Sequence, residues 1–203
     1  TQSFDLLLVG TDNPEPGTGN NRSDAIMIGS LDPASRQIKL VSVLRDCYAA
    51  IPGHDINRIN EAFSLGGAAL LLETVNHNFG LDLKYYVQVD FSAFANIVDI
   101  LGGVDIPVTE AESSHVFGDS RAAGTYHLTG SEALSYCRIR KIDNDFGRTQ
   151  RQRNLLTSIY QTFSKEGDQK ILSLFWELVP QIETNLAAED MVTLFKQHRL
   201  LDN

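Results

Sequence analysis

The sequence predicts a three-layer α/β or α+β fold in one domain. Segments typical of strands are mixed along the chain with helical segments of moderate length, a pattern that favours sheets covered by helices. The chain has 203 residues, enough to bury one sizeable core. Its hydrophobic content of 42% and charged content of 21% are those of an ordinary globular domain. No internal repeat or convincing linker interrupts the chain, so the predicted domain covers residues 1–203.

The N-terminal part predicts three strands, at residues 4–10, 25–31 and 38–43. A loop rich in Asn, Pro and Gly spans residues 12–21, and Asp32-Pro33-Ala34-Ser35 has the composition of a turn. Short connections favour antiparallel neighbours, so we expect these strands to form an antiparallel meander.

Helices and strands alternate in the rest of the prediction. Gly80 is expected to end a helix that Gly66-Gly67 opens, and Thr129 and Glu132 have capping-box spacing at the start of a short helix. Residues 110–126 lack clear periodicity and predict a loop or an edge hairpin. The other predicted elements are helices 68–79 and 94–101, strands 85–89 and 104–108, and helices 146–163, 171–179 and 188–200.

Arginines concentrate in one part of an otherwise acidic chain. Residues 137–153 hold five of the eleven arginines, although the net charge is -9. Guanidinium groups bind phosphate oxygens bidentately and stay charged at any working pH. This local concentration indicates a concave site for a small polyanionic group. A pI near 4.9 argues against a nucleic-acid partner, because phosphate-backbone binding needs a broad basic face.

Acidic residues are predicted to meet an arginine at one edge of the sheet. Asp12 ends the first strand and Asp24 begins the second, while the third strand returns toward the same edge and delivers Arg45-Asp46. Two carboxylates beside an arginine suit Mg²⁺ and a phosphate, because Mg²⁺ takes one or two carboxylates together with waters and substrate phosphates. In the plainer interpretations, Asp12 and Asp24 only stabilise turns by hydrogen-bonding to the backbone, and Arg45 and Asp46 form an ordinary surface ion pair.

Spacing groups the other candidate side chains. Arg138 and Arg140 flank Ile139, so both lie on one face if this segment is extended. Arg148 and Gln152 are four residues apart and share a face of the following helix.

Four further residues close in sequence to the candidate arginines are interpreted as structural or surface residues. Arg151 and Arg153 fall on other faces of that helix, where we expect a solvated helix start. Cys47 and Cys137 each lie close to a candidate arginine. A disulfide between them and two separate buried thiols are both compatible with the sequence.

Several known site types are missing from the sequence. It contains no Gly-x-x-x-x-Gly-Lys-Ser/Thr loop, no Gly-x-Ser-x-Gly elbow and no His-Glu-x-x-His pattern. The five histidines are scattered without a zinc-binding spacing. No apolar run is long enough to cross a bilayer, and no leader is recognisable. The chain begins almost directly in a strand, from which we expect an anchor or signal to have preceded it.

Together, ordered motifs over residues 4–165 resemble the LytR-CpsA-Psr family of cell-envelope proteins. Each motif alone is weak, whereas the ordered set is specific. Leu44 and Cys47 depart from the proline and the small polar residue of many relatives. The matching segments are Leu8 to Asp12, Arg22 to Asp24, Val41 to Asp46, Ile51 to Gly53, Arg58 to Phe63, Gly66-Gly67, Asp99 to Val104, Leu128 to Gly130, Ala133-Leu134, Arg138 to Arg140, Asp145 to Arg148, and Gln150 to Gln152.

The resemblance implies an α/β/α fold with a central mixed sheet. It also implies a magnesium-dependent phosphotransferase that takes a glycopolymer from a polyprenyl-pyrophosphate carrier and attaches it to a peptidoglycan sugar hydroxyl. Teichoic acids and capsular polysaccharides are the usual cargo of such enzymes. Family members typically carry one N-terminal transmembrane helix, which would precede Thr1 and hold this domain at the extracytoplasmic face of the membrane.

The same resemblance implies residue roles. Asp46 is a candidate general base that could instead orient Arg45. Arg22 would steady the Asp24 loop or touch phosphate. The other implied roles are Mg²⁺ binding by Asp12 and Asp24, a pyrophosphate clamp of Arg45, Arg138, Arg140 and Arg148, and a hydrogen bond from Gln152.

Two other functions remain as alternatives to the transferase. One is a lipid-pyrophosphate phosphohydrolase, and the other is a non-catalytic lipid-carrier binding or regulatory module.

Overall fold

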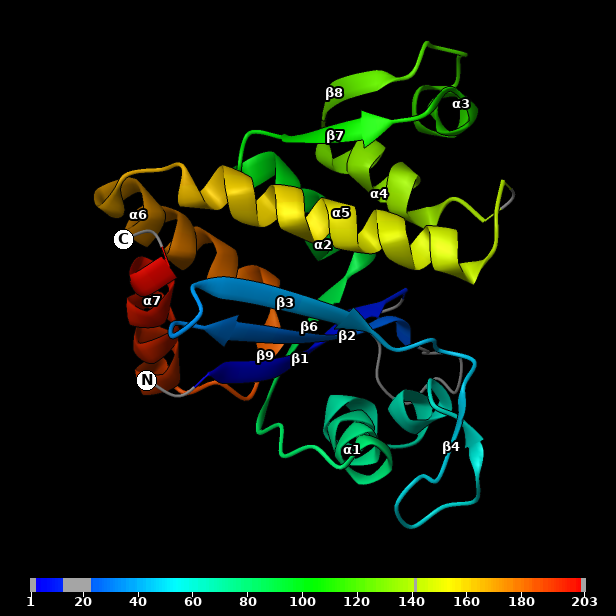
Figure 1. Ribbon diagram of the computed structural model, residues 1–203, viewed down its shortest axis with the longest axis vertical. Helices are drawn as coiled ribbons and strands as arrows, with labels where there is room; N and C mark the ends of the chain where they lie inside the picture. Colours follow the sequence, from blue (N-terminus) through cyan, green and yellow to red (C-terminus); the bar gives the residue numbers. More distant parts are fainter. Residues whose placement is uncertain (1–2, 13–22, 141, 202–203) are drawn as a thin grey trace. The chain divides into compact units, whose positions relative to one another are not determined.

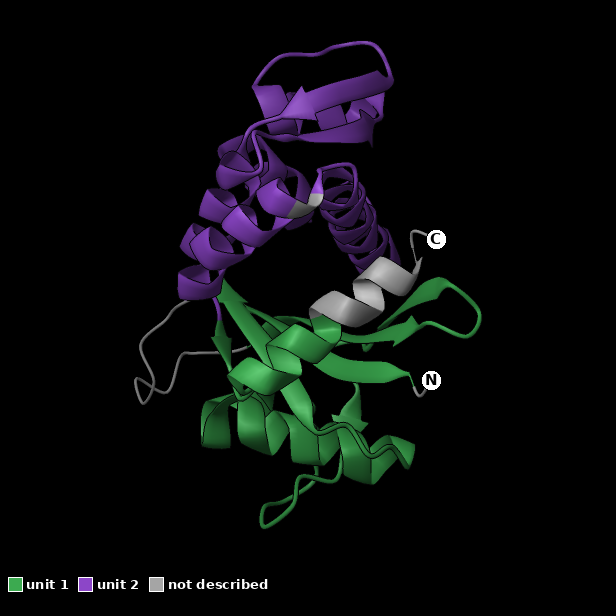
Figure 2. Ribbon diagram, turned by 90° about the vertical axis from the view of Figure 1, so that its left-hand side faces the viewer, with its two compact units in different colours: residues 1–90, 183–203 green, residues 91–182 purple. Residues whose placement is uncertain are grey.

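The structure is a computed structural model that describes residues 3–12, 23–140 and 142–201. It contains two compact units, which are coloured separately in Figure 2. Unit 1 comprises residues 1–90 and 183–203, and unit 2 comprises residues 91–182. The chain therefore leaves unit 1 once and returns to it once. A single domain over residues 1–203 stays a prediction.

Unit 1 is built on a mixed sheet with the strand order β3-β2-β1-β6-β9. β1 pairs antiparallel with β2 and parallel with β6, while β3 and β9 pair antiparallel at the two edges (Figure 1). The predicted meander and the mixed sheet are therefore confirmed. The strands are β1 (Phe4–Thr11), β2 (Ser23–Asp32), β3 (Gln37–Ser42), β6 (Tyr85–Asp90) and β9 (Glu183–Thr184).

Helices cover both faces of this sheet within unit 1. Leu7 and Val9 of β1 point to one face and pack in a core cluster with Leu71 of helix α1 (Glu61–Phe79). Phe4 and Leu6 point to the opposite face, in a cluster that includes residues of α7 (Ala188–Leu201). Alternate side chains of β1 thus contribute to two hydrophobic clusters, one on each face of the sheet. Unit 1 shows the expected α/β/α layers, with α1 and α7 on opposite sides of the sheet (Figure 2).

Helix α1 begins earlier than predicted. The helical run starts at Glu61 and bends at Gly66 and Gly67, whose backbone angles are non-helical. Gly67 has φ +66, which a residue with a side chain adopts only with strain. The two glycines therefore separate a short first piece, which was not predicted, from the helix over residues 68–79, whose predicted opening at these glycines is confirmed. Gly80 ends the helix in a left-handed conformation, as predicted.

Unit 2 contains helices and a β-hairpin around its own core. Val98, Val104, Leu128, Tyr136 and Leu155 are almost fully buried in one cluster. The predicted helices and strands of this region are confirmed within a few residues. The elements are α2 (Phe91–Ile100), β7 (Val104–Val108), α3 (Glu110–Phe117), β8 (Gly124–Leu128), α4 (Gly130–Arg138), α5 (Asp145–Ser164), α6 (Asp168–Leu178) and a 3-10 turn, η1 (Val179–Gln181).

The prediction of a loop or hairpin over residues 110–126 is wrong for its first half. Residues Glu110–Phe117 form α3, and only Gly124–Leu128 joins the hairpin with β7. The helix buries Glu112, Ser113 and Val116, so two of its three buried residues are polar. The sequence therefore lacks the helical spacing of apolar residues that would predict this helix. Thr109 and Glu112 form a complete capping box, as do Thr129 and Glu132 before α4. None of the helices in the described ranges combines the length and hydrophobicity that a bilayer crossing requires.

Candidate functional site

The two predicted metal-binding acids lie at the same edge of the unit 1 sheet. Thr11 and Ser23 are opposite each other in the β1–β2 ladder, and the register shifts between Gly10 and Thr11. Asp12 and Asp24 directly follow these paired residues. The Asp24 side chain is 14% exposed, whereas Asp12 is open to solvent. The edge thus presents one sheltered and one accessible carboxylate.

Arg45 and Asp46 occupy a turn that follows β3 and reaches this edge. The Arg45 guanidinium forms an ion pair with the Asp24 carboxylate. Its Nε lies 3.5 Å from one oxygen of Asp46. The other Asp46 oxygen lies 3.5 Å from Nη1 of Arg58. Acidic and basic groups therefore alternate in a row, which we call the unit 1 charge row: Asp24, Arg45, Asp46 and Arg58.

Backbone contacts hold the charge row in place. The amide of Asn60 donates to the Arg45 carbonyl at 3.2 Å, and the amide of Ile59 donates to the Cys47 carbonyl at 2.7 Å. Arg58 belongs to the short strand β5 (Asn57–Arg58), which pairs with β4 (Tyr48–Ala49). The chain segments that carry Arg45 and Arg58 are thus fixed to each other.

Sequence reasoning missed Arg58 and Asp90. Asp90 ends β6, and its register partner in β1 is Thr11, so a further carboxylate stands at the edge occupied by Asp12 and Asp24. The sequence signal for Asp90 was its position at the end of a predicted strand. This signal places Asp90 beside Asp12 only if the parallel pairing of β6 with β1 is known, and that pairing joins residues about eighty positions apart.

The acids at this edge suit Mg²⁺ by their chemistry. Carboxylate oxygens are hard ligands, and Mg²⁺ in phosphate-transferring sites usually keeps waters and substrate oxygens in its shell. Among the described residues, no group of three or more His, Cys, Asp or Glu side chains gathers as a ready metal cage. A pair of carboxylates completed by waters and phosphate oxygens is the arrangement that Asp12 and Asp24 fit.

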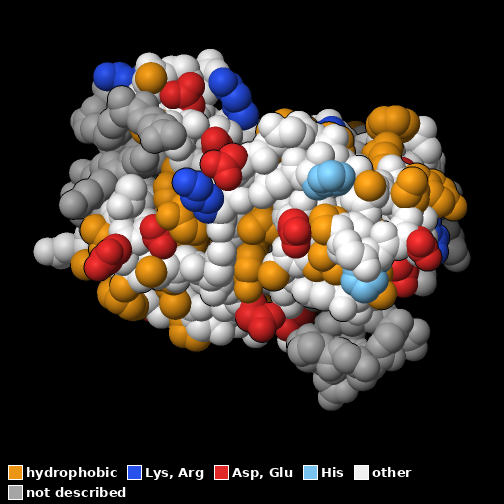
Figure 3. Space-filling view, turned by 90° about the horizontal axis from the view of Figure 1, so that it is seen from below, with side chains coloured by type: hydrophobic (Ala, Val, Ile, Leu, Met, Phe, Trp, Pro, Cys, Tyr) orange, Lys and Arg blue, Asp and Glu red, His pale blue; other side chains and the backbone are white. Residues whose placement is uncertain are grey.

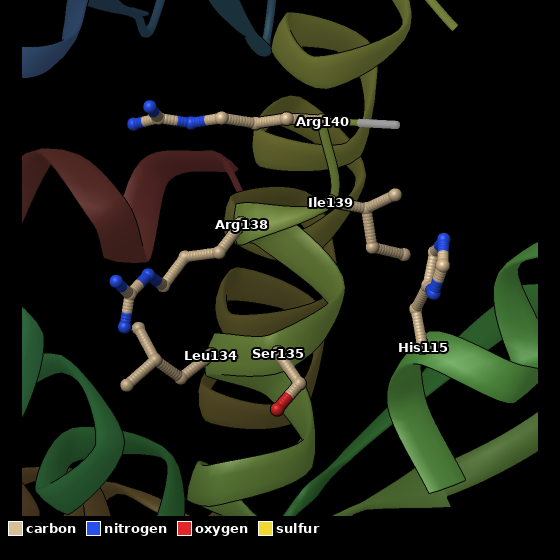
Figure 4. Close-up of a pocket in the computed structure, with 6 residues that line it drawn as sticks. All are labelled: His115, Leu134, Ser135, Arg138, Ile139 and Arg140. Carbon is tan, nitrogen blue, oxygen red and sulfur yellow. The ribbon is translucent and has the colours of Figure 1, made fainter. Parts of the chain in front are cut away.

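Unit 2 carries the predicted arginines near the end of α4. Arg138 is the last residue of that helix, Ile139 is buried at 4% exposure, and Arg140 is exposed. Figure 4 shows the side chains of Arg138 and Arg140 pointing to the same side, with Ile139 turned away. The guanidinium of Arg138 lies over the Phe91 ring, 4.6 Å from its centroid. This is cation–π geometry, which restrains the side chain.

An open cavity of about 480 Å³ surrounds the end of α4. Sequence reasoning assigned no site role to His115, Leu134 or Ser135, which border the cavity with the arginines (Figure 4). The lining residues are His115, Leu134, Ser135, Arg138, Ile139 and Arg140.

Arg148 and Gln152 lie one turn apart on α5. The Arg148 side chain is 8% exposed, and its Nη2 lies 2.7 Å from a carboxylate oxygen of Asp145. Asn144 caps the helix by accepting hydrogen bonds from the amides of Phe146 and Gly147. The cap fixes where α5 begins and therefore where Arg148 stands.

The prediction that Arg151 belongs to a solvated helix start is wrong. Arg151 is 2% exposed, and both of its Nη atoms contact Asp143, at 2.7 and 2.8 Å. Hydrogen bonds and charge attraction from this pair lower the pKa of Asp143 and raise that of Arg151. Arg153 is partly buried and donates to Gln150 at 2.7 Å. Helical spacing could not reveal partners that come from other segments.

Two further predictions concern residues outside these groups. Arg22 lies outside the described residues. Cys47 is an exposed free thiol, so no disulfide joins it to Cys137.

The predicted site residues that the structure describes form two sets. Asp12, Asp24, Arg45 and Asp46 belong to unit 1, and Arg138, Arg140, Arg148 and Gln152 belong to unit 2.

Charged side chains of both signs are interspersed on the face shown in Figure 3. Acidic and basic groups there stand among apolar and uncharged ones. This mixed surface accords with a net charge of -9 in a chain that has 17 basic residues.

Comparison with known proteins shows a regulatory protein and a teichoic acid transferase among the relatives. Regulatory protein MsrR of Staphylococcus aureus (strain COL) is 37% identical over 163 residues, which are 79% of this chain and 48% of MsrR. The polyisoprenyl-teichoic acid–peptidoglycan teichoic acid transferase TagU of Bacillus mycoides is 32% identical over 210 residues, covering 98% of this chain and 66% of TagU. The chain therefore spans about half to two thirds of these relatives.

Solved structures of TagT share the fold. TagT bound to LIIa-WTA superposes with a TM-score of 0.82 at 29% identity, covering 98% of this chain and 75% of that one. A TagT structure with bound octaprenyl pyrophosphate lipid gives 0.76 at 27% identity, covering 98% and 73%. The LytR_cpsA_psr family model matches residues 1–202. This chain belongs to the LytR-CpsA-Psr family.

Proposed function

We propose that the protein is a magnesium-dependent phosphotransferase for cell-wall glycopolymers. It takes the polymer from a polyprenyl-pyrophosphate carrier and attaches it to a sugar hydroxyl of peptidoglycan. The observation that carries the proposal is the Asp24–Arg45 ion pair beside Asp12 at one sheet edge. This arrangement offers carboxylates for a cation and a guanidinium for phosphate in one place. TagU and the lipid-bound TagT support the substrate class.

The reaction exchanges one phosphate ester bond for another. The acceptor hydroxyl oxygen attacks the phosphorus that carries the glycopolymer, and the bond between this phosphorus and the bridging oxygen breaks. Polyprenyl phosphate leaves with that oxygen, and the hydroxyl proton passes to a base or to solvent. Transfer of this kind depends mainly on positioning and on neutralising phosphate charge.

The arginines supply positioning and charge. Arg45, Arg138, Arg140 and Arg148 bind the pyrophosphate oxygens, and Gln152 adds a hydrogen bond. Forked guanidinium groups match two phosphate oxygens at once, so they also fix the direction of the phosphate chain. Mg²⁺ held by Asp12 and Asp24 would neutralise phosphate charge further when it is bound.

We assign Asp46 a positioning role in preference to the role of general base. Each of its two oxygens faces a guanidinium, that of Arg45 and that of Arg58. These two attractions, each at 3.5 Å, compete with the approach of the carboxylate to an acceptor hydroxyl. The main effect of Asp46 is to direct Arg45 toward the sheet edge.

The proposed substrates place the protein at the extracytoplasmic face of the cell membrane. The carrier lipid is embedded in the bilayer and the peptidoglycan acceptor lies outside it. A membrane anchor preceding Thr1 would keep the domain close to both. This location and anchor are part of the proposal.

A product analysis tests the proposal. The protein is incubated with a synthetic polyprenyl-pyrophosphate oligosaccharide and peptidoglycan fragments, with and without Mg²⁺, and products are identified by mass spectrometry. We expect an oligosaccharide joined to peptidoglycan by a phosphodiester, only with Mg²⁺. Asp24→Asn and Arg138→Ala should abolish it. Asp32→Asn, at the opposite end of β2, is the matched control and should retain it.

The other products would identify the alternatives. Free phosphorylated oligosaccharide in place of the conjugate indicates a phosphohydrolase. Binding of the lipid without cleavage indicates a carrier-binding or regulatory module. Either result contradicts the transferase.

A further inference from the structure

The buried guanidinium of Arg151 connects three segments of unit 2. Its Nη atoms bind both oxygens of Asp143, at 2.7 and 2.8 Å. Nη1 also lies 3.3 Å from Oε1 of Glu112, and Nη2 donates to the carbonyl of Ile139 at 3.0 Å. These partners come from α3, from the end of α4 and from the loop before α5. Arg151 therefore joins the pieces of chain that surround the predicted phosphate-binding arginines.

The contact to Ile139 lies next to the predicted phosphate-binding arginines. Ile139 lies between Arg138 and Arg140, and its carbonyl belongs to the peptide bond that leads into Arg140. A hydrogen bond to this carbonyl fixes the orientation of that peptide, and burial of the Ile139 side chain fixes the other side of the segment. The two exposed arginines consequently leave the chain in the common direction that Figure 4 shows.

Two features show that the surrounding structure accommodates this contact set. Glu112 uses Oε2 to accept from the amide of Thr109 at 2.9 Å, so its other oxygen is held toward Arg151. Gly147 faces the Asp143 carboxylate so closely that a side chain there would collide with it. The capping box of α3 and the glycine of α5 both serve the same ion-pair cluster.

We propose that Arg151 is a positioning residue that holds Arg138 and Arg140 in a phosphate-binding orientation. The inference rests on the proposed function, because it gives these arginines a pyrophosphate to bind. Arg151 itself is too buried to touch substrate, with 2% exposure. Its effect passes through the Ile139 carbonyl and the Asp143 and Glu112 carboxylates.

Only arginine satisfies all of these partners. A lysine ammonium keeps the positive charge for Asp143, but it lacks the planar fork that binds two carboxylate oxygens while another N–H reaches a carbonyl. Arg151→Lys should therefore preserve the charge balance of the cluster while releasing Ile139. Arg153→Lys is the matched control, two residues further along the same helix.

The test measures binding, local order and catalysis on the full chain. Affinity for inorganic pyrophosphate is measured by calorimetry, hydrogen exchange reports on the segment containing Ile139, and kcat and KM are determined with the lipid-linked substrate. We expect Arg151→Lys to stay folded, to exchange faster at this segment, and to lose about tenfold in pyrophosphate affinity and about tenfold to a hundredfold in kcat. Arg153→Lys should match the wild type in each measurement.

A purely structural role would give a different result. In that case Arg151→Lys would melt at a lower temperature but keep wild-type pyrophosphate affinity and kcat below its transition, which overturns the inference. Asp143→Asn provides a second route, because it weakens the same cluster without changing Arg151. Wild-type affinity in that variant, despite faster exchange at Ile139, also overturns it.

The measurement of pyrophosphate affinity distinguishes failure of this inference from failure of the proposed function. A wild type that binds pyrophosphate but transfers nothing contradicts the transferase, while an affinity loss in Arg151→Lys still supports the positioning role. A wild type that does not bind pyrophosphate overturns the positioning role.

Discussion

Arg45 and Asp24 form an ion pair between residues 21 positions apart in the sequence, one in the turn after β3 and the other at the start of β2. Their side chains are 20% and 14% exposed. A partly buried pair is screened less by solvent than a surface pair. Asp24 is also a proposed Mg²⁺ ligand, so the cation and the guanidinium act on the same carboxylate.

This shared carboxylate predicts an unusual effect of Arg45→Ala. Removing the guanidinium leaves Asp24 without that competing positive charge, so Mg²⁺ affinity should rise several-fold. Asp24→Asn should lower it by at least about tenfold, because it removes a charged ligand. Titration calorimetry with Mg²⁺ measures both. Lower Mg²⁺ affinity in Arg45→Ala would contradict competition between the two cations.

Asp46→Asn distinguishes a positioning residue from a general base. A positioning role predicts a loss of about tenfold in transfer rate, with the acidic limb of the pH–rate profile preserved. Loss of a general base would cost about a hundredfold to ten-thousandfold and would remove that limb. Arg58→Ala should reproduce the smaller effect, because it releases the same carboxylate from its other side. Rates measured across pH for both variants decide between the roles.

The Asp143–Arg151 pair predicts acid sensitivity of unit 2. Hydrogen bonding from Arg151 lowers the pKa of Asp143 from its ordinary value of 3.8. A carboxyl with a lowered folded-state pKa stabilises the fold above its unfolded value, and this contribution is lost as the pH falls through the folded value. Thermal melts of the wild type should therefore drop steeply below pH 3.8. Asp143→Asn should be less stable near neutrality and should show a flatter acid limb.

His127 predicts the opposite pH dependence. Its Nδ1 lies 2.8 Å from an Asp105 oxygen and its Nε2 lies 2.8 Å from the Gly102 carbonyl, so both nitrogens face acceptors. The Asp105 hydrogen bond, with help from Gly102, raises the pKa of His127 above 6.5. The protonated ring therefore stabilises the fold below pH 6.5, and this contribution is lost as the pH rises through the higher folded value.

His127→Gln checks this expectation, because glutamine does not titrate. The melting temperature of the variant should change less with pH across this window than that of the wild type. Equal slopes for the two proteins would show that His127 does not contribute.

Local patterns suffice to predict much of the fold. The β1–β3 meander follows from apolar runs joined by a turn, and Asp32 confirms the turn by accepting hydrogen bonds from the amides of Ala34 and Ser35. Because strands in a meander reverse direction at each turn, the sequence alone places Asp12 and Asp24 at one edge of the sheet. Capping-box spacing likewise locates the start of α4 at Thr129.

Features that depend on distant partners cannot be predicted in this way. The sequence predicts a solvated Arg151 because its three protein partners lie in separate segments of the chain. Asp90 joins the sheet edge only through the parallel pairing of β6 with β1. Helix α3 lacks a clear helical period because its buried face includes Glu112 and Ser113 in place of apolar residues.

Binding of a polyprenyl-pyrophosphate glycan is the most stringent experiment, because the proposed function assigns a role in pyrophosphate binding to Arg45 and to Arg138. Calorimetry compares the wild type with Arg45→Ala from unit 1, Arg138→Ala from unit 2, and the exposed control Arg36→Lys in the β2–β3 turn. We expect each alanine variant to lose at least about tenfold in affinity, while the control keeps the wild-type value. Wild-type affinity in either folded alanine variant would overturn the proposed role of that arginine.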